Sequence, residues 1–186
     1  MGLFRGIKLD VQKFHREVIK WSATKQMMTV ALLASVAALL QSAGGYIPII
    51  GFFISPFTTL PIIIATLITF RHGLFAYGLT IVLLLILEPA ELFIFPFTTG
   101  LLGLGVGCGL IIFMKRLYIT VVNGVLLSIG IFIPLYLLDF PVFGPMTSSA
   151  ISVKVMLSIF LFSILYSGLW VQISLFFIRR LDKVIR

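Results

Sequence analysis

Apolar runs fill most of this chain beyond its first 25 residues and leave it few folds. Hydrophobic residues make up 60% of the 186 residues, and charged residues only 11%. A water-soluble domain of this length cannot hide so much apolar surface, because a globule of this size still exposes much of its area. Backbone groups in lipid must be bonded within their own segment, and the runs lack the alternation of a membrane barrel. The sequence therefore predicts an all-α integral membrane protein.

Six apolar segments are predicted to span the membrane. They cover residues 26–43, 49–70, 73–88, 92–114, 117–138 and 153–178. Some are shorter than the ~20 residues that a perpendicular helix needs, and 73–88 is the weakest of them. The chain length indicates a single membrane domain, which we place at 25–186. We expect it to consist of three consecutive helical hairpins.

The basic residues give these segments an orientation. If the N-terminus lies in the cytoplasm, every one of the 14 Lys and Arg residues except Lys154 falls on the cytoplasmic side. The positive-inside rule predicts this asymmetry for an even number of spans. We therefore expect a multi-pass protein of the plasma membrane with both termini in the cytoplasm. The net charge of +8 is explained by topology and does not indicate nucleic-acid binding.

The first 24 residues follow a different pattern. Apolar residues recur there at spacings of three and four, and most basic residues lie away from the resulting stripe. The stripe consists of Phe4, Ile7, Val11, Phe14, Val18 and Trp21. This pattern is typical of an amphipathic helix in the lipid interface, held by apolar burial and anionic headgroups. The helix at 1–24 is interpreted as a membrane anchor, with docking of a cytoplasmic partner as the alternative.

A short phrase occurs three times, each time after a loop without basic residues. Its copies are Pro56-Phe57-Thr58-Thr59, Pro96-Phe97-Thr98-Thr99 and Pro145-Met146-Thr147-Ser148. Proline suits the first turn of a helix, because the N–H that it lacks would be unpaired there. Polar groups and anions are favoured at such helix starts. We expect some of the hydroxyls to line a cavity; the alternative is that the phrase caps or kinks helices, above all at Pro56.

Acidic residues complete the candidate ligand site. Three of the six Asp and Glu residues precede a copy of the phrase on the outer side, and carboxylates at membrane depth usually have a task. The predicted ligand-binding residues are Thr58, Glu88, Glu91, Phe97, Thr98, Thr99, Asp139 and Lys154. The acids favour a cationic or amine-bearing ligand, whereas Lys154 and the helix starts favour an anion. The two cues oppose each other and leave the substrate open.

No catalytic set is visible in the sequence. His15 lies on the amphipathic helix and His72 follows Arg71 in a short turn, without the spacing of a nucleophile–base pair or a metal site. The alternating glycines of 103–109 lie inside an apolar segment, so they predict close helix packing and not a phosphate loop. We expect a protein that is not an enzyme and that needs no cofactor or metal ion.

The overall plan resembles the substrate-binding S component of an energy-coupling factor (ECF) transporter. The likeness rests on six short spans with both ends inside, a basic N-terminal arm, small residues at 29–38, Pro-rich outer loops and a Gly-rich helix at 100–109. It implies capture of a vitamin-like micronutrient, with a transmembrane coupling protein and cytoplasmic ATPases as partners besides lipid. It also implies that Ala34 and Ala38 contact the coupling protein.

A second family is similar in size and hydropathy plan. These are the rod-shape-determining membrane proteins of the MreD family, which would be scaffolds without a small ligand. An outer cavity lined by the repeated Thr residues favours the transporter, and a closed outer face favours the scaffold. The helix starts alone suggest a third interpretation, a protein that handles lipid headgroups.

Overall fold

The computed structural model describes residues 2–47, 49–113, 115–138 and 153–185, and every regular element within these ranges is helical. Five stretches are long and apolar enough to cross a membrane. They are α2 (Ala23–Tyr46), the stretch Ile50–Ile68, α5 (Phe70–Leu87), the stretch Arg116–Leu137 and the part Val153–Arg180 of α8 (Val153–Ile185). The prediction of an all-helical chain with several apolar helices is confirmed.

The fourth predicted span is shorter than expected. Instead of a helix over 92–114, α6 is 14 residues long and runs from Thr99 to Ile112. Before it lie the 3-10 helix η2 (Pro89–Phe93) and a turn at 94–98. Pro96 in this turn has no N–H to donate, and a proline disfavours helical geometry at the residue before it. At ~1.5 Å per residue α6 is about 21 Å long, against ~30 Å of hydrocarbon, so six full spans and three hairpins stay a prediction.

The first copy of the repeated phrase lies within a helix. α3 (Ile50–Ile54), η1 (Ser55–Thr58) and α4 (Thr59–Ile68) follow one another directly, with Pro56 in the first turn of the 3-10 helix η1. A local 3-10 turn accommodates the donor that proline lacks. The second copy ends where α6 begins, and the third copy, at 145–148, lies outside the described residues. Pro56 therefore lies at a break within the helical stretch, which is the alternative that the sequence left open for it, whereas Pro96 lies in the turn before α6 and not in its first turn.

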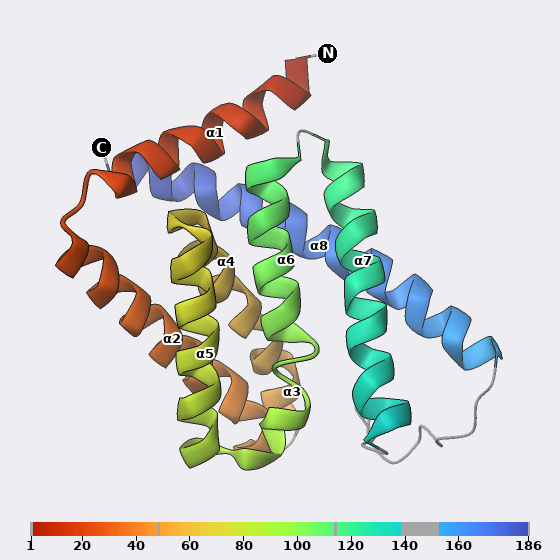
Figure 1. Ribbon diagram of the computed structural model, residues 1–186. Coiled ribbons are helices and arrows are strands. Elements are labelled where there is room, and N and C mark those ends of the chain that lie inside the picture. Colours follow the sequence, from red (N-terminus) through yellow and green to blue (C-terminus); the bar gives the residue numbers. More distant parts are fainter. Residues whose placement is uncertain (1, 48, 114, 139–152, 186) are drawn as a thin grey trace.

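The helices pack around a core between α2, α4, α5, α6 and α7 (Arg116–Phe132). Figure 1 shows α5, α6 and α7 running lengthwise, with α8 crossing obliquely behind α6 and α7 and packing most extensively on α7. The short π-helical stretch η3 (Ile133–Leu137) extends α7. Both termini lie at one end of the molecule (Figure 1), and the turn that leads into α6 lies toward the other end.

The N-terminal helix α1 (Gly2–Ile19) packs on the bundle itself. It contacts α8, α6 and α4, and the stripe residues Val11, Phe14 and Val18 are buried. The ring Nδ1 of His15 lies 3.1 Å from the carbonyl oxygen of Leu67. The predicted amphipathic helix is present, but the described part of its apolar face is covered by the chain's own helices rather than by lipid or a partner.

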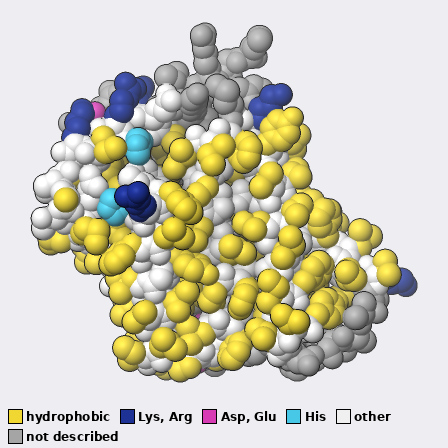
Figure 2. Space-filling model, viewed as in Figure 1, with side chains coloured by type: hydrophobic (Ala, Val, Ile, Leu, Met, Phe, Trp, Pro, Cys, Tyr) yellow, Lys and Arg dark blue, Asp and Glu magenta, His cyan; other side chains and the backbone are white. Residues whose placement is uncertain are grey.

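The sides of the molecule are apolar. Ile86, Leu117 and Leu137 are 79%, 72% and 78% exposed, and large continuous apolar patches are rare on soluble monomers. Figure 2 shows apolar side chains over most of the visible face, while most of its basic side chains lie toward the end that carries the termini. This distribution is compatible with a protein surrounded by lipid.

The glycines of α6 allow close packing on two sides. Gly103 and Gly107 face α4, whereas Gly105 and Gly109 face α7. A Cβ added at Gly103 would come within 2.8 Å of the Cβ of Ile62, closer than two packed carbon atoms approach. The prediction that these glycines serve close helix packing is confirmed, and it explains how the short α6 is held between α4 and α7.

Candidate functional site

Three buried polar side chains from three elements form one hydrogen-bonded chain, which we call the relay. Gln41 of α2 donates from Nε2 to Oε2 of Glu91 in η2 over 2.7 Å. Thr99, the first residue of α6, donates from Oγ1 to Oε1 of Gln41 over 2.8 Å. The three side chains are 1% (Gln41), 6% (Glu91) and 8% (Thr99) exposed. Buried polar groups are costly unless they are bonded, so the relay ties α2, η2 and α6 together at a defined point.

Two glycines of α2 make room for the acidic residues. A Cβ at Gly44 would lie 2.6 Å from Oε1 of Glu91, and one at Gly45 would lie 2.6 Å from the carboxyl carbon of Glu88. The η2 turn fixes Glu91 from its backbone side, since its carbonyl oxygen accepts from the N–H of Phe95 over 2.8 Å. Gly44 and Gly45 therefore let η2 lie close to α2, and this brings the carboxyl group of Glu91 within hydrogen-bond distance of Gln41.

Burial changes the acidity of Glu91, which lies outside the five spans. Desolvation disfavours the charged form and raises the pKa of this carboxyl. The hydrogen bond from Gln41 lowers the pKa by a smaller amount, and the negative charge of Glu88 raises it further. The net pKa of Glu91 lies above its ordinary value, so this group keeps its proton to a higher pH than an exposed glutamate does.

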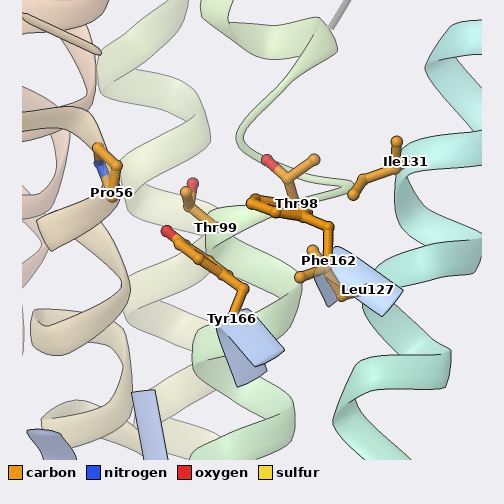
Figure 3. A pocket seen from close by; sticks show the side chains of 7 residues that line it. All are labelled: Pro56, Thr98, Thr99, Leu127, Ile131, Phe162 and Tyr166. Atoms are coloured by element: carbon orange, nitrogen blue, oxygen red, sulfur yellow. The ribbon is translucent and has the colours of Figure 1, made fainter. Parts of the chain in front are cut away.

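A cavity of about 150 Å³ lies beside the relay. It is partly open, and its walls are almost entirely apolar. Its lining residues come from η1, the turn before α6, α6, α7 and α8; they are Pro56, Thr98, Thr99, Leu127, Ile131, Phe162 and Tyr166. Figure 3 shows the ring of Tyr166 extending from α8 toward Thr99 and Pro56. Thr99 belongs both to the cavity wall and to the relay, so it connects the cavity with the buried carboxyl group.

Both described copies of the repeated phrase reach this cavity, though through different residues. Pro56 represents the first copy, and Thr98 and Thr99 represent the second. Thr98 donates to the carbonyl oxygen of Ile94 over 2.7 Å. Thr58 is fully buried elsewhere and donates to the carbonyl oxygen of Ala37 over 3.3 Å. The predicted threonines therefore divide into two that line the cavity and one that joins η1 to α2.

The remaining predicted ligand residues lie apart from the cavity lining. Glu88 is half-buried against Gly45, and Phe97 is half-buried in the turn before α6. Lys154 is exposed in the first turn of α8, and Asp139 lies outside the described residues. Glu91 reaches the cavity only through Gln41 and Thr99. The described part of the chain therefore places no charged side chain in the cavity wall.

Ala34 and Ala38 lie inside the protein. Both are fully buried, and α2 packs most extensively on α5. Thr80 of α5 donates to the carbonyl oxygen of Ala34 over 3.3 Å. The small residues expected to meet a coupling protein thus allow α5 to approach α2, and they offer no exposed surface to a partner in this structure.

Sequence reasoning missed Gln41, Tyr166 and the apolar wall that α7 contributes. Gln41 did carry a readable signal, because a polar side chain near the end of an apolar span usually has a partner or a task. Tyr166 carried none, since aromatic residues are common throughout the chain. Both histidines are engaged in packing: Nδ1 of His15 lies against the carbonyl oxygen of Leu67, and the hydroxyl of Thr69 caps α5 by accepting from the backbone N–H of His72. Among the described residues, no three His, Cys, Asp or Glu side chains gather as a metal site would need.

Comparisons of the chain with protein-family models, with curated proteins and with solved structures find no match. The likeness to ECF S components and to MreD proteins therefore stays at the level of the overall plan. The cavity and the relay are the observations on which a function can be proposed.

Proposed function

We propose that the protein captures a small molecule from outside the cell, as the substrate-binding subunit of an uptake system of the ECF type. The observation that carries this proposal is the cavity, which both described copies of the repeated phrase reach. In this proposal a coupling protein and ATPases supply the energy for uptake. Since Ala34 and Ala38 are buried, the coupling protein would bind elsewhere on the molecule.

The composition of the cavity supports ligand binding. Small-molecule sites are typically concave and mostly apolar, with a few polar groups that fix orientation. This cavity combines apolar side chains from α7 and α8 with the hydroxyl-bearing residues Thr98, Thr99 and Tyr166. Thr99 connects the cavity through Gln41 to the buried carboxyl group of Glu91, whose pKa is raised. Groups with perturbed pKa values cluster at functional sites.

The size of the cavity limits the ligand. Its volume of about 150 Å³ is below the ~300–1,000 Å³ of sites for drug-sized ligands. An engineered apolar cavity of ~150 Å³ in another protein binds benzene. The proposal therefore requires a ligand, or a buried part of a vitamin-like ligand, about as large as one aromatic ring.

A scaffold of the MreD type is the second candidate, and the small cavity is the observation that favours it. In a scaffold the relay would only join α2, η2 and α6, and the cavity would be a packing gap. The two candidates differ in one measurable property, because a scaffold of this kind has no small-molecule ligand.

Filling the cavity should abolish ligand binding. We expect a panel of vitamins and ring-sized compounds to contain a molecule that raises the melting temperature by about 5–10 °C at a hundredfold excess over its dissociation constant. In Ile131→Phe the larger side chain occupies the cavity, and this shift should disappear. Ile129→Phe adds the same ring on the exposed side of α7, where the residue is 51% exposed, and should keep the shift. Native mass spectrometry of each variant with the panel gives an independent readout.

One result would decide against capture, and a second against this cavity as the ligand site. If no compound binds the unmodified protein, the scaffold proposal moves ahead. If Ile131→Phe binds as well as Ile129→Phe does, the ligand site lies elsewhere.

The membrane orientation can be tested with a matched pair of alanines. We expect Ala90→Cys, in η2, to react with an impermeant thiol reagent on intact cells, in a Cys108→Ser background. Ala23→Cys, at the start of α2, should react only after permeabilisation, because the positive-inside rule places that end in the cytoplasm. Both alanines are exposed. The reverse labelling would exclude the proposed orientation.

A further inference from the structure

The relay has a fixed hydrogen-bond direction while Glu91 is ionised. An ionised Glu91 only accepts hydrogen bonds, so Gln41 must present its NH₂ group to it. The amide oxygen of Gln41 then faces Thr99, and this oxygen also only accepts. Thr99 must therefore donate its single hydroxyl proton to Gln41, over the observed 2.8 Å.

The hydroxyl of Thr98 also has a fixed direction. Its hydroxyl proton goes to the carbonyl oxygen of Ile94 over 2.7 Å. Both threonine hydroxyls beside the cavity thus have a committed proton and free lone pairs. The little polar surface that they give its almost wholly apolar wall can therefore accept a hydrogen bond but cannot donate one. Tyr166 is the other hydroxyl in the wall, and a tyrosine can donate or accept, so it sets no direction.

The charged side chains that the structure describes lie off the cavity. Glu88 lies against Gly45, Lys154 is exposed in the first turn of α8, and Glu91 bonds to Gln41. A charged ligand in these apolar walls would lose its hydration without gaining a counter-charge from the described residues, which is strongly unfavourable. Neither Glu88 and Glu91 nor Lys154 therefore favours a charged ligand in this cavity.

We infer that the cavity takes a neutral, largely apolar molecule of about one ring, and that the relay selects, through Thr99, a ligand that donates a hydrogen bond. The inference rests on the proposed capture function and specifies its substrate class. Gln41 and Glu91 act as positioning residues, because they orient the Thr99 hydroxyl without touching the ligand.

The test compares ring compounds of matched shape on the full-length protein in detergent. Pyrrole carries an N–H donor and furan an oxygen acceptor in rings of similar size. Titration calorimetry should give pyrrole an affinity roughly threefold to tenfold higher than furan, the range expected for one neutral hydrogen bond. Toluene should bind, whereas benzoate and benzylammonium should not.

Variants of the relay test whether Glu91 orients the Thr99 hydroxyl or only supports the fold. Glu91→Gln lets the relay run in either direction, because an amide both donates and accepts. The pyrrole preference should then shrink toward onefold, while toluene binding is unchanged. Thr99→Val removes the acceptor and should abolish the preference, and Thr98→Val serves as the comparison within the same wall.

Each outcome has a distinct meaning. If toluene and pyrrole both fail to bind while a compound of the vitamin panel binds, the inference falls and capture stands; if nothing binds, the capture function falls with it. If pyrrole and furan bind equally, or if benzoate or benzylammonium binds, the inference falls and capture stands. If Glu91→Gln keeps the full pyrrole preference, the relay does not set it.

Discussion

Replacing Gly130 by alanine should destabilise the folded protein by about 1–3 kcal/mol or more. Gly130 lies in α7 where this helix passes the turn before α6, and an added Cβ would overlap the carbonyl oxygen of Phe97. A backbone oxygen cannot swing aside as the tip of a side chain can. Relief would require α7 to move away from the turn, which would also displace Ile131 from the cavity.

Gly78→Ala is the matched control for this prediction. Gly78 lies in α5, and a Cβ there meets nothing within 4 Å. Adding the same methyl group should leave stability unchanged or raise it by about 0.5–1 kcal/mol, since glycine is unfavourable inside a helix. Thermal melting in detergent and the folded fraction on gel filtration measure both variants. Equal melting temperatures for the two would mean that α7 does not approach the turn as described.

The long apolar helices were the part of the fold that sequence could predict. The predicted segment 73–88 corresponds to α5 (Phe70–Leu87), and 117–138 corresponds to the stretch Arg116–Leu137. Apolarity sustained over such lengths leaves few alternatives to a helix in lipid. The start of α6 was missed because the turn at Pro96 depends on local geometry and on contacts with α7. The apolar character of a segment predicts neither of these.

The relay shows why the site itself was only partly predictable. Glu91 and Thr99 were singled out, but Gln41, which joins them, was not. Gln41 is 50 residues from Glu91 and 58 residues from Thr99 in the chain. A single sequence does not reveal which side chains meet over such separations, and the same limit hid the fact that Ala34 and Ala38 are buried within the protein.

Replacing Gln41 by leucine should destabilise the protein by about 1–3 kcal/mol, and by more while Glu91 is ionised. The change leaves the buried carboxylate of Glu91 without its N–H donor and Thr99 without its acceptor. The double variant Gln41→Leu with Glu91→Met should recover much of this loss, because replacing both partners by apolar groups is often nearly neutral. Thermal melting of the two single variants and of the double variant measures the coupling between the two residues.

The pH dependence of the Gln41→Leu variant distinguishes ionisation of Glu91 from simple loss of packing. Burial raises the folded-state pKa of Glu91, and the bond from Gln41 counteracts this. A raised carboxyl pKa means that stability is greatest below the unfolded pKa and falls as pH rises through the folded pKa. Without Gln41 the pKa should rise further, so the loss should be largest near about pH 8 and should shrink toward about pH 5. Glu88 is present in both proteins, so its effect on Glu91 cancels in the difference. A loss that stays the same over this range would mean that the protonation of Glu91 does not contribute to it, and the loss would then be one of packing and of the two hydrogen bonds of Gln41.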